Sequence, residues 1–109
     1  MNKKIKCVIQ RPGQLSEIIN VEDNFFYIRD LLGGVPEYIK ISDLNLSLIF
    51  ISNNHFLPYN IYYPDKDIIC GTVIIMKEVN DTAISMTISE IQDARSWLLN
   101  HTYGGKEHE

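Results

Sequence analysis

The sequence predicts an α+β domain, with a mainly antiparallel sheet of five to six strands and two helices packed on one side. Three observations support this prediction. Short stretches in which apolar and polar residues alternate recur along the chain, as in half-buried strands. Two other stretches have the helical period and begin at capping residues. The element order is β-β-α-β-β-β-(β)-α, and because strands and helices do not alternate regularly, parallel βαβ units are not expected.

Length and composition indicate one globular domain. The chain has 109 residues, of which 45% are hydrophobic and 22% charged, as is usual for a folded domain with one core. We expect a single domain over 1–109, with an ordered core over about 3–103. The charged, glycine-containing end at 104–109 is expected to be a flexible tail.

The first third of the chain predicts a hairpin and a helix. Lys4 to Gln10 and Glu17 to Val21 are expected strands, and the Pro-Gly pair between them suits a turn. Asn24 to Leu32 is an expected helix, since a capping Asn precedes apolar residues at helical spacing. Gly33 follows where a helix commonly ends in a left-handed residue.

Further strands are expected after the first predicted helix. Glu37 to Ile41, Leu46 to Ser52 and Ala83 to Met86 alternate or are short and apolar. Ile68 to Val79 is the most hydrophobic strand, and its near lack of charge suits a central position with burial on both faces. Gly71 within it indicates a bulge or a close packing partner.

The second helix has a clear beginning. Thr87 and Glu90 fit a capping box, in which each side chain accepts a hydrogen bond from the backbone N–H of the other. Apolar residues then follow the helical period, and we expect the helix to end at Asn100 or Gly104.

The apolar runs, the N-terminal residues and the cysteines all favour a cytoplasmic protein. The longest apolar run, Ile68 to Met76, is far shorter than the ~20 residues that span a bilayer. The N-terminal residues lack the apolar region and cleavage site of a signal peptide. We therefore expect a cytoplasmic protein without membrane partners, in which Cys7 and Cys70 act as small buried hydrophobes. A disulfide between them stays open as an alternative.

Charge and residue spacing argue against several classes of site. Ten basic and fourteen acidic residues give a net charge of −4, and the basic residues beyond the N-terminus are scattered, so nucleic acid is not an expected partner. No histidine or cysteine pair has metal-ligand spacing, and no cofactor is expected. Asp65 and Asp67 could serve acid–base chemistry or hold a cation, but turn formation and a solvated charge cluster are the simpler interpretation. Arg11, Arg29 and Arg95 would form a bidentate anion site only if two of them converged.

Several motifs together resemble one protein family. They are a Gly-Gly pair with the strand after it, an apolar strand leading through Asn-Asn to Pro-Tyr-Asn, an Asp-Ile-Ile-Cys-Gly-Thr stretch, and a Thr-capped helix, found at Leu31 to Ile41, Leu48 to Asn60, Asp67 to Val73 and Thr87. In this order they resemble the phage-associated domain-of-unknown-function family 3846 over most of the chain. Asn54 stands where that family has Glu, and Val35-Pro36 looks like an insertion. The resemblance implies a phage or prophage origin and no particular reaction.

The segment from His55 to Asp67 is expected to be irregular, because proline and asparagine interrupt it. It contributes most of the candidate binding residues: Asn53, Asn54, His55, Phe56, Tyr59, Asn60, Tyr62 and Tyr63. Tyr and Asn combine contact area with adaptable hydrogen bonds, and aromatic rings can stack on a base. The alternative is that these rings merely cover a sheet edge.

The favoured function is a small non-catalytic phage or prophage accessory protein that binds a host protein, for example to inhibit a host defence. One alternative is a sponge that sequesters a small nucleotide signalling molecule, which needs a pocket with aromatic walls and convergent Arg or Lys. Others are a structural accessory domain without ligand and an unrecognised enzyme using Asp65, Asp67 or His55. A homo-oligomer could form if Leu46 to Ser52 or Glu17 to Val21 is an exposed edge.

Overall fold

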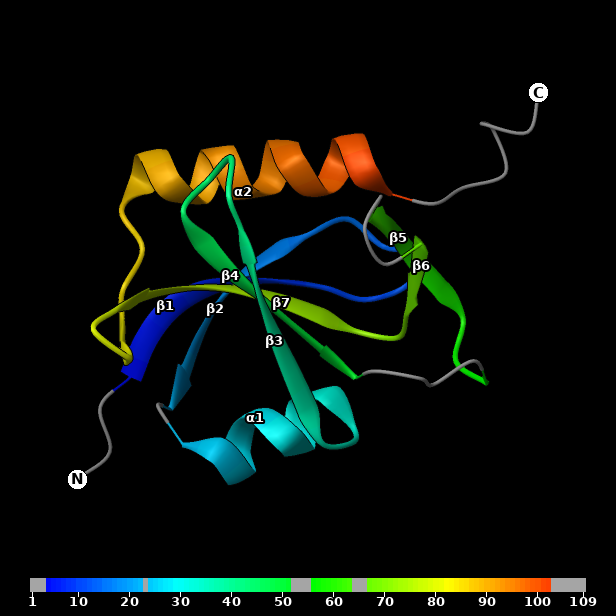
Figure 1. Cartoon of the computed structure of the whole chain (residues 1–109), viewed down its shortest axis with the longest axis horizontal. Helices are drawn as coiled ribbons and strands as arrows, with labels where there is room; N and C mark the ends of the chain where they lie inside the picture. The colour runs from blue at the N-terminus through cyan, green and yellow to red at the C-terminus, as the bar shows by residue number, and fades with distance from the viewer. Residues whose placement is uncertain (1–3, 23, 52–55, 64–66, 103–109) are drawn as a thin grey trace.

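The structure is a computed structural model that describes residues 4–22, 24–51, 56–63 and 67–102. Within these ranges six strands form one antiparallel sheet in the order β2-β1-β7-β4-β3, with β8 pairing with β7 (Figure 1). Its strands are β1 (Lys4–Gln10), β2 (Glu17–Glu22), β3 (Pro36–Ile41), β4 (Leu46–Ile51), β7 (Val73–Val79) and β8 (Thr82–Ile84). The α+β class with a mainly antiparallel sheet and two helices is confirmed.

Strand β7 lies at the centre of this sheet. Its Ile74 is opposite Ile9 of β1 and also opposite Ile49 of β4. All residues from Val73 to Met76 are buried, and because successive side chains of a strand point to opposite faces, both faces of the sheet are covered here. The burial on both faces that was predicted for Ile68 to Val79 is therefore confirmed for Val73 to Met76, whereas Val79 at the end of the strand is exposed.

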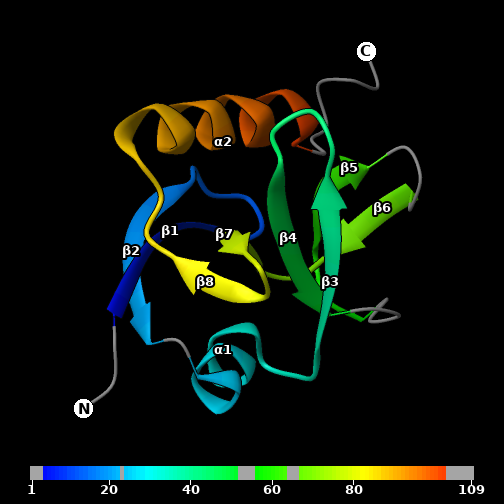
Figure 2. The same cartoon turned by 60° about the vertical axis from the view of Figure 1, so that its left-hand side comes forward.

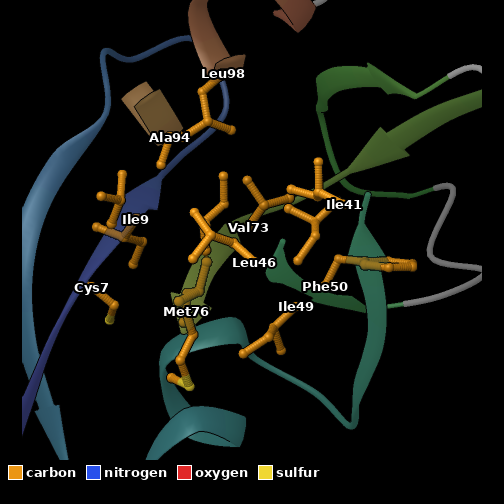
Figure 3. Close-up of a cluster of buried hydrophobic side chains, with 14 of the residues drawn as sticks. Cys7, Ile9, Ile41, Leu46, Ile49, Phe50, Val73, Met76, Ala94 and Leu98 are labelled. Carbon is orange, nitrogen blue, oxygen red and sulfur yellow. The ribbon is translucent and has the colours of Figure 1, made fainter. Parts of the chain in front are cut away.

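The two helices lie on opposite faces of the sheet, not on one side as predicted. Helix α2 (Ile88–His101) lies above the strands and α1 (Phe25–Leu32) below them in both views (Figures 1 and 2). Figure 3 shows Leu98 of α2 above the sheet and Met76 of β7 pointing the other way, towards α1. The physical reason is that a central strand apolar on both faces needs a cover on each.

Both helices begin where the sequence indicates. The side chain of Asn24 accepts hydrogen bonds from the backbone of Phe26 and Tyr27, and Gly33 ends α1 with a φ of 86°. In α2 the capping box is present: Thr87 N donates to Glu90 Oε1 at 2.8 Å and Glu90 N donates to Thr87 Oγ1 at 3.2 Å. Helix α2 ends at His101.

The predicted strand from Ile68 to Val79 is divided by Gly71, which has a φ of 84°. A Cβ at Gly71 would lie 2.6 Å from Leu57 Cδ1, so the predicted close packing partner is confirmed. Residues before this bend form β6 (Asp67–Cys70), which pairs with β5 (Tyr59–Tyr63) in a separate two-stranded sheet. The segment predicted to be irregular thus contains a strand, because β6 provides it with a partner.

The remaining boundaries agree closely with prediction. Strands β1 to β4 begin and end within one residue of their expected positions, and β1 and β2 form the expected hairpin. Strand β8 ends before the predicted Ser85 and Met86, which hydrogen-bond Lys6 of β1 instead. In the described part of the chain, neither helix has the length and apolar character needed to cross a membrane.

The β2 edge of the sheet corresponds to the expected edge at Glu17 to Val21. Strand β4 is not an edge, because it pairs with β3 on one side and β7 on the other. Self-association through Leu46 to Ser52 is therefore excluded as a route to an oligomer over the described residues of that strand.

Candidate functional site

Five of the candidate binding residues can be placed, while Asn53, Asn54 and His55 lie outside the described residues. Three of the five are exposed: Phe56 at 99%, Tyr59 at 52% and Tyr62 at 48%. The other two, Asn60 and Tyr63, point towards the body of the protein. The segment therefore divides into an outward aromatic part and an inward anchoring part.

A bulge between Tyr59 and Ile61 places the two exposed tyrosines on one face of the β5–β6 hairpin. Tyr59 is opposite Cys70 and Tyr62 is opposite Ile68, two residues apart on β6. Residues two apart on a strand share a face, so their partners share it as well. Without the extra residue, Tyr59 and Tyr62 would point to opposite faces.

Asn60 is buried and holds the hairpin to the main sheet. Its Nδ2 donates to Gln10 O at 2.8 Å and to Gly71 O at 2.7 Å. Its Oδ1 accepts a hydrogen bond from Gln10 Nε2 at 2.9 Å. Asn60 therefore cannot act as the surface contact residue that the sequence suggested, and its role is to fix the position of β5.

Tyr63 anchors the other end of β5. Its ring centroid lies 5.7 Å from that of Trp97 on α2. The imidazole of His101 stacks on the Trp97 ring system, with ring centroids 4.0 Å apart and an interplanar angle of 17°. His101 Nδ1 also lies 2.8 Å from Trp97 O, which makes it a helix-end residue in this fold.

A groove of about 770 Å³ lies between the β1–β2 turn and one flank of α2. Its lining includes Ser16 of the turn, Arg95 of α2 and the buried Gln10. Arg95 Nε donates to Ser16 Oγ at 3.0 Å and Arg95 Nη2 donates to Ser16 O at 3.1 Å. The sequence did not predict this groove, because its two walls are 79 residues apart in the chain.

The two cysteines are free and buried, so the disulfide alternative is not realised. Burial raises the pKa of the Cys7 thiol to about 12 and raises the pKa of Cys70 as well. A thiol that stays protonated at neutral pH is a poor nucleophile and a poor metal ligand. This agrees with the predicted role of small buried hydrophobes.

The candidate catalytic groups are only partly placed. Asp65 and His55 lie outside the described residues, and for Asp67 the backbone alone is described. Among the residues that the structure describes, no group of three or more His, Cys, Asp or Glu could hold a metal ion.

Comparisons with known proteins give no match: no protein family, no curated protein and no solved structure resembles the chain significantly.

Proposed function

We propose that this chain is a small non-catalytic accessory protein that binds a host protein through the outward face of the β5–β6 hairpin. The observation that carries the proposal is the placement of Tyr59 and Tyr62 on one exposed face, with the exposed Phe56 three residues earlier in the chain. A phage or prophage origin, and a role such as inhibiting a host defence, rest on the resemblance described for the sequence.

Two properties of the hairpin support binding of a protein. Tyrosine provides a large rigid contact area with a polar tip and loses little conformational entropy, so it is enriched among residues that dominate binding energy. The strand that carries both tyrosines is fixed at Asn60 by three hydrogen bonds and at Tyr63 by packing on Trp97. A surface that is already rigid before binding loses less conformational entropy on association, so binding costs less free energy.

The first prediction concerns these tyrosines. The double variant Tyr59→Ala/Tyr62→Ala should lose capture of its partner, with an affinity lower by about 100-fold, since each such contact contributes roughly 1 to 2 kcal/mol. The measurement is affinity capture from lysate of the bacterial host, followed by calorimetry with the purified partner. Tyr38→Ala on β3 is the matched control, because Tyr38 is 42% exposed but lies on the other sheet.

A partner that binds the double variant and the wild type equally well would contradict the proposed surface. So would a partner whose binding depends on Tyr38 and not on the hairpin. Far-UV circular dichroism of all three proteins separates a loss of binding from a loss of fold.

The nucleotide-sponge alternative remains a prediction. The groove beside α2 offers the cation Arg95, but no aromatic ring is among its lining residues in the described part of the chain. Native mass spectrometry after incubation with a nucleotide panel tests it directly.

A further inference from the structure

We propose that the groove between the β1–β2 turn and α2 binds a small organic anion, whose oxyanion meets Arg95 and whose aliphatic body lies between Leu15 and Leu99. This site is separate from the β5–β6 hairpin, and the inference does not depend on the function proposed above.

The charge of the groove favours an anion. Arg95 is the only ionisable side chain among its described lining residues, although the protein as a whole has a net charge of −4. The nearby carboxylate of Glu17 lies 3.6 Å from Arg11, which offsets its charge. A guanidinium binds carboxylate and phosphate oxygens through paired N–H bonds, so an oxyanion is its natural partner.

Arg95 is held in place before any ligand arrives. Its Nε and Nη2 both donate to Ser16, which is buried. A guanidinium has five N–H donors, so these two bonds orient the group and leave others for a ligand. Because the side chain is already ordered, binding costs less conformational entropy than at a free surface arginine.

One flank of α2 brings the polar groups together. Gln92, Arg95, Ser96 and Leu99 have the spacing i, i+3, i+4 and i+7, which places them on one stripe of the helix. All four line the groove. The amide and hydroxyl beside Arg95 can donate further hydrogen bonds to the same oxyanion.

The walls of the groove carry an apolar pair. Leu15 on the turn is 75% exposed and Leu99 on α2 is 66% exposed, and both line the groove. One exposed leucine is ordinary, but two on facing walls beside a fixed cation suit a ligand with an apolar body. Both side chains are aliphatic, so they favour an alkyl chain over a stacked base. The volume lies within the usual range of small-molecule sites.

The proposal is tested by titrating the ¹⁵N-labelled protein with octanoate and octyl phosphate, which separate a carboxylate from a phosphate ligand. Two control compounds are acetate, which has an anionic group without a long alkyl chain, and 1-octanol, which has the alkyl chain without the charge. The backbone signals of residues 13–16 and 92–99 should shift with at least one of the two amphiphilic anions. Acetate and 1-octanol should each bind at least about 10-fold more weakly than the amphiphilic anion. Equal affinity for acetate, or shifts concentrated on α1, would overturn the proposal.

Two variants with matched controls complete the test. Arg95→Gln should weaken binding about 10-fold, whereas Arg29→Gln on α1 should stay within about twofold. Leu99→Ser should weaken binding about fivefold, whereas Ile88→Ser, which lies on α2 outside the groove and is also exposed, should not. Leu99→Ser leaves both Arg95–Ser16 bonds in place, so it remains decisive if Arg95→Gln loosens the turn. Wild-type affinity in both groove variants would overturn the proposal.

Discussion

Gln10 and Asn60 connect three parts of the fold with their side chains. Gln10 Nε2 donates to Asn60 Oδ1 and, at 3.2 Å, to Thr102 Oγ1 after α2. Asn60 Nδ2 returns hydrogen bonds to β1 and to the bend at Gly71. Both side chains are almost fully buried, and no described buried side-chain N or O atom lacks a partner. Networks of this kind specify one arrangement of the elements, since any shift leaves buried polar groups unpaired.

The second prediction follows from this network. Asn60→Ala should lower the free energy of unfolding by about 3 kcal/mol, because it leaves two buried carbonyls and one amide donor without their partner. Urea unfolding measures the change. The control Asn20→Ala, at an exposed position of β2, should change it by less than about 0.5 kcal/mol. An Asn60→Ala protein as stable as the control would show that the network contributes nothing to stability.

The third prediction concerns Cys7 in alkaline solution. Its pKa is raised to about 12 in the fold, whereas an exposed thiol in the unfolded chain ionises near pH 8.5. Between these values only the unfolded state loses the proton, so Cys7 contributes stability at neutral pH that falls as the pH rises. The wild type should lose about 1 to 2 kcal/mol relative to Cys7→Ala between pH 8 and pH 10. Parallel stability curves for the two proteins would contradict this assignment.

At the scale of elements, the bend at Gly71 decides how the C-terminal half folds. It redirects one apolar stretch from the small β5–β6 sheet into the centre of the main sheet. Gly71 N donates to Pro58 O at 2.8 Å, which closes the loop that carries β5. A residue with a side chain would meet both an unfavourable φ and the side chain of Leu57.

The fourth prediction separates these two effects. Gly13→Ala meets only the positive φ, because nothing lies within 4 Å of its Cβ, and should destabilise the protein by about 1 kcal/mol. Gly71→Ala should destabilise it by about 2 kcal/mol or more, since Leu57 must also move. Chemical unfolding of both variants and of Gly71→Ala/Leu57→Ala gives the answer. Equal effects at Gly13 and Gly71 would show that the contact with Leu57 is unimportant.

The sequence predicted those elements whose signals are local. Alternation of apolar residues marked β1 to β4, and side-chain caps marked the beginning of each helix. Strand β5 was missed because Pro58 and Asn60 resemble loop residues, whereas Asn60 is in fact turned inward at a bulge. The groove was missed because it depends on a turn meeting a helix from the other end of the chain.

At the scale of the whole molecule, the placement of the two helices on opposite faces of the sheet could have been predicted from the sequence. The stretch Ile68 to Val79 was expected to be buried on both faces, and a strand buried in this way requires cover above and below the sheet. With α1 on one face and α2 on the other, the α2 side carries the groove and the tyrosine anchor. An ion pair of 2.8 Å between Lys77 Nζ and Glu90 Oε2 joins α2 to the central strand and lowers the pKa of Glu90.

The position of β7 between β1 and β4 also has a consequence for how the chain folds as it is synthesised. The β1–β2 and β3–β4 hairpins each pair neighbouring segments, so both can form early as separate pieces. Until β7 leaves the ribosome, each piece keeps an unpaired backbone edge that could associate with another chain. The two hairpins therefore join into one sheet only when β7, which follows both in the chain, pairs with β1 and β4.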